Sequence, residues 1–135
     1  MRFKKIKFSV ASYLVDGNYN LTLKFSKKGK ISVNYKPLFL GKSKSFKFNE
    51  EDSIKLDRKL RNLNLDKISS NVNDGSLFDG EEWETVIFYD DLPTQKFKIK
   101  MPFTKEWLKV KEIVNLVIKK GEIDYGLSKS KRNSA

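Results

Sequence analysis

Apolar and polar residues alternate along most of the first 48 residues, which is the pattern of strands that bury one face. Four alternating runs stand at residues 5–10, 19–26, 31–36 and 45–48. Turn residues separate them, such as Asp16-Gly17-Asn18 and Lys27-Lys28-Gly29. Alternating runs between glycine-containing turns predict hairpins. We therefore expect a four-stranded antiparallel meander with one face buried and the other in water.

A helical pattern follows the fourth run. Asn49 is a favourable N-cap, and the acids at 50–52 suit the positive end of the helix dipole. Leucines then recur on one helical face, at Leu56, Leu60 and Leu63. Residues 64–80 are rich in Asn, Ser, Asp and Gly, which is typical of a loop.

The remaining pattern predicts a second hairpin and a closing helix. Strands at 83–89 and 95–101 flank a turn at 90–93, and Thr104 predicts the cap of a helix that ends before Gly121. Residues 122–135 are interpreted as a flexible basic tail. The order ββββ-α-ββ-α predicts a single α+β domain over residues 1–121, with the C-terminal helix packed on one face of the sheet.

The shared phase of the apolar positions predicts one common core. A solvent-exposed Leu23 with Lys24 inside would contradict this assignment of faces. The residues expected to be buried together are Ile6, Phe8, Leu21, Leu23, Phe25, Ile31, Val33, Phe46, Trp83, Ile87, Phe97, Ile99, Trp107, Val114 and Val117.

A local motif adds a resemblance in the last third of the chain. Asp79-Gly80-Glu81-Glu82-Trp83 is followed by a strand pair, Pro102 and a helix that begins near Trp107. This resembles small uncharacterised bacterial proteins in which an Asp-Gly-x-x-Trp hairpin leads through a proline turn into a closing helix. Met101 stands where that pattern often has Gly or Asn. The resemblance implies a topology and no chemistry.

Composition excludes several classes of function. The chain contains neither cysteine nor histidine, so disulfides, thiolate metal sites and histidine proton shuttles are impossible. No apolar run approaches the length of a membrane span, and the N-terminal residues carry charge without a following apolar segment. We expect a cytoplasmic protein that needs no cofactor.

Charge is divided into three blocks along the chain. Residues 1–48 carry twelve Lys or Arg and one acid, residues 49–95 carry five and twelve, and residues 96–135 carry eleven and four. The excess of 24 lysines over 4 arginines is also what an AT-rich genome would produce without selection for binding. That explanation accounts for the number of lysines but not for their segregation, which sets where anions are attracted.

The water-facing side of the predicted sheet is the first candidate site. Lysines there alternate with Ser, Thr and Asn, a combination of point charges and neutral donors that suits a phosphate backbone. The alternative is a solubilised face whose lysines block edge pairing. The candidate nucleic-acid-binding residues are Lys5, Lys7, Lys24, Lys36 and Lys47, with a matching series at Lys96, Lys98 and Lys100.

The aromatic residues argue against recognition by base stacking. Most of them, for example Phe8, Phe25 and Phe97, share the phase of the apolar core positions, whereas Tyr13 alone shares the phase of the lysines. A reader of single strands needs exposed rings. Nucleic acid is therefore expected to bind through charge and shape.

The acidic middle of the chain suggests neither a metal site nor catalysis. Residues 74–79 lack the ligand spacing of an EF-hand, and the nearest Asp-x-Lys, at 57–59, lies in a predicted helix. A solvated loop is the simpler interpretation, and acids that complement a basic protein partner or mimic phosphates are a further one. We expect a protein that is not an enzyme.

The loop from Pro37 to Gly41 carries three large apolar residues, Leu38, Phe39 and Leu40. They either fold under the sheet or protrude and anchor a protein partner. The leading hypothesis is a small binding protein that engages nucleic acid or a nucleoprotein through its lysines. The alternative is an inhibitor or accessory factor from a phage or mobile element, acting for example on a defence nuclease. A domain without any ligand is the third possibility.

Overall fold

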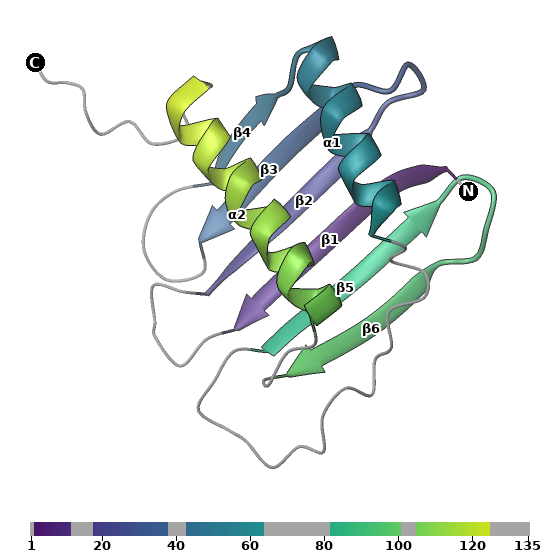
Figure 1. The fold of residues 1–135 in the computed structure, drawn as a ribbon, viewed down its shortest axis with the longest axis vertical. Helices are drawn as coiled ribbons and strands as arrows, with labels where there is room; N and C mark the ends of the chain where they lie inside the picture. The colour runs from purple at the N-terminus through teal and green to yellow at the C-terminus, as the bar shows by residue number, and fades with distance from the viewer. Residues whose placement is uncertain (1, 12–17, 38–42, 64–81, 101–104, 125–135) are drawn as a thin grey trace, which may run out of the picture.

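An antiparallel sheet of six strands, covered on one face by two helices, makes up the described part of this α+β protein (Figure 1). The structure is a computed structural model that describes residues 2–11, 18–37, 43–63, 82–100 and 105–124. The elements are β1 (Phe3–Ala11), β2 (Tyr19–Phe25), β3 (Ile31–Pro37), β4 (Lys44–Lys47), α1 (Glu50–Asn62), β5 (Glu82–Tyr89), β6 (Gln95–Lys100) and α2 (Lys105–Asp124).

The strands lie in the order β4-β3-β2-β1-β5-β6. The first four pair with their sequence neighbours, and β5 and β6 form a hairpin that is added beside β1. The first strand of the chain is therefore an inner strand, with β2 on one side and β5 on the other.

The predicted assignment of sheet faces is confirmed. Leu23 is 1% exposed and its neighbour Lys24 is exposed. Phe25 and Phe46 are partly buried against the core, while the side chains of Phe97 and Ile99 lie outside the described residues. The other residues expected in the core are buried: Ile6, Phe8, Leu21, Ile31, Val33, Trp83, Ile87, Trp107, Val114 and Val117.

One core residue escapes the alternating pattern. Phe3 is 2% exposed although it shares odd numbering with the outward-facing Lys5 and Lys7. The pairing of β1 with β5 shifts between Phe3 and Lys5, which marks a β-bulge. The extra residue of a bulge changes which face the next side chain occupies. Phe3 therefore stacks on Tyr89 with ring centroids 5.8 Å apart.

Both helices lie across the same face of the sheet (Figure 1). Asn49 caps α1, because its side chain accepts a hydrogen bond from the Asp52 backbone N–H at 2.7 Å. On α2 the expected apolar stripe is buried, and the Trp107 ring meets Trp83 edge-on at 5.7 Å between centroids. None of the helices in the described part of the chain is long and apolar enough to span a bilayer.

The closing helix extends further than expected. It continues through Gly121 to Asp124, so Glu122–Asp124 belong to α2 and not to a tail. A glycine ends a helix where it adopts a positive φ. Among the described residues the glycine with positive φ is Gly29, in the β2–β3 turn. Residues 125–135, like most of the motif at 79–83 and Pro102, lie outside the described residues.

Candidate nucleic-acid interface

The outer face of β1–β4 brings together lysines that are far apart in the sequence. The register pairs Lys5 with Lys24, Lys24 with Ser32, and Ser32 with Lys47. These four residues therefore form one row across four strands. We call the outer-face set Lys5, Lys7, Lys24, Lys36 and Lys47 the lysine face.

A second row on the same face is mostly neutral. It runs from Lys7 through Thr22 and Asn34 to Ser45. The Asn34 side-chain amide donates a hydrogen bond to the Ser45 hydroxyl at 2.7 Å. Lys36 follows beyond this row on β3, where it pairs with Asn20. Small hydroxyl and amide groups thus lie between the cations.

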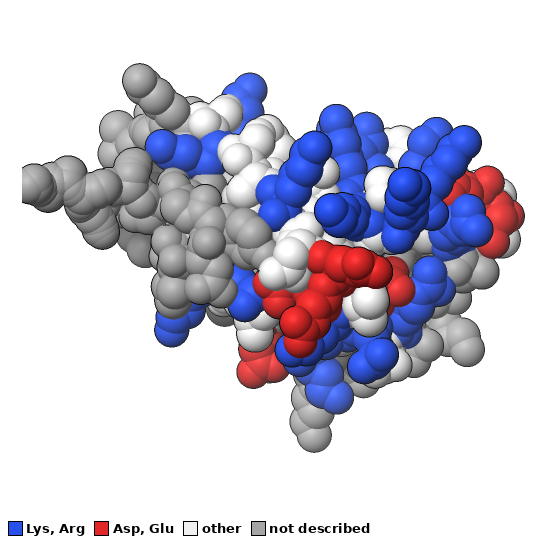
Figure 2. All heavy atoms as spheres, turned by 90° about the horizontal axis from the view of Figure 1, so that it is seen from above, with Lys and Arg blue, Asp and Glu red and all other residues white. Residues whose placement is uncertain are grey.

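The charge of the lysine face is not balanced by its own strands. No Asp or Glu occurs in β1, β2, β3 or β4. Lys7, Lys24, Lys36 and Lys47 are exposed, and Lys5 is half-buried with its ammonium 4.9 Å from the centre of the Phe88 ring. Figure 2 views the end of the molecule where α1 begins, and Lys and Arg side chains lie along its upper part and also below the central acids. This arrangement attracts anions.

The other part of the sheet differs, because two of the predicted lysines on β6 have acids beside them. Lys96 contacts Glu84 and Lys98 contacts Glu82, each with 3.5 Å between Nζ and Oε2. The two acids lie on β5, between β1 and β6. Lys96 and Lys98 thus each have a carboxylate beside them, whereas β1–β4 carry none. Lys100 pairs in register with Glu82, and its side chain lies outside the described residues.

The remaining candidates from the sequence are only partly described. Leu38, Phe39 and Leu40 lie outside the described residues, as do the acids at 74, 79 and 81. Asp90 lies 3.7 Å from the Arg2 guanidinium. Within the described ranges no three carboxylates come together in a way that could hold a metal ion.

Asp91 holds the start of the chain. Its Oδ1 accepts a hydrogen bond from the Arg2 backbone N–H at 3.0 Å. This hydrogen bond, more than any other influence, keeps the pKa of Asp91 below its ordinary value. The Asp91 carboxylate is thus committed to a structural contact at the end of the β5–β6 hairpin.

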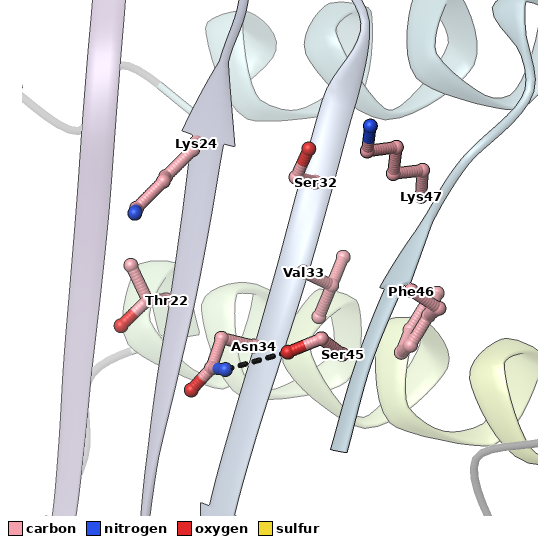
Figure 3. A pocket seen from close by; sticks show the side chains of 8 residues that line it. All are labelled: Thr22, Lys24, Ser32, Val33, Asn34, Ser45, Phe46 and Lys47. Atoms are coloured by element: carbon pink, nitrogen blue, oxygen red, sulfur yellow. Dashed lines mark hydrogen bonds between the residues drawn. The ribbon is translucent and has the colours of Figure 1, made fainter. Parts of the chain in front are cut away.

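A shallow hollow of about 250 Å³ lies on the lysine face, over β2, β3 and β4 (Figure 3). It is a feature that the sequence pattern did not indicate. Lys24 and Lys47 stand at it, together with the polar side chains Thr22, Ser32, Asn34 and Ser45. Ammonium groups with hydroxyl and amide donors are the chemistry that holds a phosphate oxygen.

No protein-family model matches this chain, and no curated protein is similar to it. The interpretation of the lysine face therefore rests on its own residues: their register, their exposure and their charge.

Proposed function

We propose that this protein binds nucleic acid, free or in a nucleoprotein, through the lysine face and without reading its sequence. The observation that supports the proposal is the arrangement on β1–β4, where five lysines converge with neutral donors between them and no acid in the four strands. Phosphate contacts position a protein on nucleic acid but carry no sequence information. Lysine suits this role because its ammonium is a point charge on a flexible stem.

We propose binding without sequence recognition because of the groups that the lysine face exposes. Phe88, the ring next to it, is half-buried and lies beneath the Lys5 ammonium. Base stacking needs rings that are open to solvent, and groove reading needs an inserted helix or ribbon. A sheet face with short polar side chains between lysines offers backbone contacts. The proposed role is binding, and catalysis is not part of it.

The test removes positive charge from the lysine face and measures the affinity for oligonucleotides at several salt concentrations. In a Lys24→Ala, Lys36→Ala, Lys47→Ala triple variant, affinity for duplex and single-stranded oligonucleotides should fall alike, whatever their sequence. The slope of log K against log salt, measured between about 50 and 200 mM, is negative and should become shallower by about 0.9 for each duplex phosphate that the variant no longer neutralises.

The matched control removes three exposed lysines from the helices instead, at Lys59, Lys109 and Lys119. It changes net charge equally and leaves the lysine face intact. Equal losses of affinity in both variants would mean that only net charge attracts the nucleic acid. Unchanged binding in the face variant would refute the proposal.

The alternative function, a protein–protein inhibitor or accessory factor, depends on the loop at 38–40. That loop lies outside the described residues.

A further inference from the structure

The hollow on the lysine face owes its depth to small side chains. Ser32 and Ser45, with Thr22 beside them, present short side chains on three adjacent strands. Val33 and Phe46 also border the hollow, but Val33 is buried on the opposite face and Phe46 is packed against the core. Short polar side chains thus contribute to the lining of the hollow, and Figure 3 shows Ser32 between Lys24 and Lys47, with Thr22 and Ser45 further along the strands.

Two lysines can approach this hollow from opposite sides. Lys24 on β2 and Lys47 on β4 are both register neighbours of Ser32 on β3. Neighbouring strands are about 4.8 Å apart, so the two lysine Cα atoms stand roughly 10 Å from each other. In Figure 3 the Lys47 side chain runs toward Ser32, whereas Lys24 leans toward β1. Lys24 is exposed, so rotation of its stem brings the ammonium over the hollow.

The neutral groups in the hollow have donors to spare. The Ser45 hydroxyl accepts its hydrogen bond from the Asn34 amide, which leaves its own O–H free to donate. The hydroxyls of Ser32 and Thr22 are donors as well. A phosphodiester offers only acceptors and a negative charge. The donor set of the hollow and the flanking ammonium groups are complementary to it.

We infer that this hollow is the point at which one phosphate group of the bound nucleic acid is fixed, between Lys24 and Lys47 and over Ser32 and Ser45. The inference rests on the proposed function and adds the location of one phosphate contact. The other lysines of the face then act as longer-range attraction, while the hollow supplies short hydrogen bonds. The two contributions differ in how they respond to salt, because only the charged groups release counterions.

The test fills the hollow without changing charge. Ser45→Val and Ser32→Val each replace a donor with a bulkier, strand-compatible side chain. Hydrogen bonds to a charged group are strong, so each variant should weaken oligonucleotide binding roughly tenfold at fixed salt. The salt slope should stay that of the wild type. Ser9→Val is the matched control, because Ser9 lies on the outer face of β1, outside the hollow, and should leave affinity unchanged.

The outcomes separate this inference from the proposed function. If Ser45→Val and Ser32→Val bind with wild-type affinity while the lysine triple variant binds weakly, the hollow is not a phosphate site. The proposed function would still stand. A loss of affinity in Ser9→Val equal to that in Ser45→Val would also overturn it. Melting curves of each variant verify that the fold is retained.

Other phosphate sources are tested in parallel. Vesicles of phosphatidylserine and phosphatidylcholine, and inorganic phosphate as competitor, report on lipid headgroups and free phosphate. Binding of vesicles but not of oligonucleotides, with sensitivity to Ser45→Val, would overturn the proposed function and assign the hollow to lipid. Binding of oligonucleotides that survives competition by inorganic phosphate in the millimolar range supports both proposals, because a polyanion makes several contacts at once.

Discussion

The hydroxyl of Ser53 accepts a hydrogen bond from the backbone N–H of Ile31 at 3.0 Å, which ties α1 to the first residue of β3. The same hydroxyl donates to the Phe48 carbonyl at 3.5 Å, and the Phe48 N–H in turn donates to the Ile31 carbonyl at 2.9 Å. Ser53 is 1% exposed, so these contacts satisfy a polar group in the core. They also fix the start of the strand that carries Ser32.

Replacement of Ser53 by Ala should lower the free energy of unfolding by about 1–3 kcal/mol, because the Ile31 N–H would be left buried without an acceptor. Urea denaturation measures the change. Ser45→Ala, at an exposed serine of β4, is the control and should stay within about 0.5 kcal/mol of wild type. A Ser53→Ala variant as stable as this control would show that the hydrogen bond contributes nothing.

Replacement of Thr85, in contrast, should stabilise the protein. It is 0% exposed, on the core-facing side of β5, and its hydroxyl has no hydrogen-bond partner among the described residues. Val has nearly the same shape without the hydroxyl, so Thr85→Val should raise the free energy of unfolding by about 1 kcal/mol. Thermal melting detects the gain. A lower melting temperature would contradict this account of the site.

Acid should loosen the attachment of the N-terminal segment to the β5–β6 turn. The Arg2 N–H lowers the pKa of Asp91 in the folded protein from its ordinary value of 3.8. A carboxyl whose pKa is depressed by folding stabilises the protein above its unfolded pKa, and this stabilisation disappears as the pH falls through the folded pKa. Wild type should therefore exceed Asp91→Asn in stability near neutral pH and lose that advantage below pH 3.8. A constant difference across the acid range would exclude this linkage.

Neutralising the acids of β5 should widen the basic surface. Glu82→Gln and Glu84→Gln free the ammonium groups of Lys98 and Lys96, which lie on β6, separated from the lysine face by β5. The double variant should bind oligonucleotides more tightly, with a salt slope steeper by up to about 0.9 for each additional duplex phosphate that it neutralises. Glu51→Gln with Glu112→Gln, two exposed acids of the helices, adds the same charge elsewhere and is the control. A gain no larger than in this control would show that Glu82 and Glu84 do not limit the interface.

Local pattern predicts much of this fold. The alternation around Leu23 and Lys24 correctly assigned the two faces of the meander, since period two is a property of each strand by itself. The cap at Asn49 and the burial of Val114 and Val117 on one side of α2 followed from equally local preferences. These features need no knowledge of which strands are neighbours.

What the sequence did not predict depends on contacts between distant residues. The burial of Phe3 depends on a bulge between β1 and β5, and no residue type in this segment predicts that bulge. The ion pairs of Lys96 with Glu84 and of Lys98 with Glu82 depend on how β5 and β6 pair, because each joins residues that are diagonal neighbours across the two strands. The hollow appears only when β3 and β4 are paired, which places Ser32 beside Lys47 and Ser45 beside Asn34. For the candidate site, the sequence thus indicated the cations of β1–β4, and the pairing of strands decided where the basic surface ends.

The inner position of β1 has a consequence for how the chain reaches its native state. Pairs within the first four strands are close in sequence, but the pairing of Ile6 with Ile87 closes a much longer loop. Closing a loop costs entropy before the native pairing can compensate for it, so distant pairings form late. We expect β1–β4 to collapse first and to expose the free edge of β1 until β5 arrives. That transient edge is the point at which a second chain could pair wrongly.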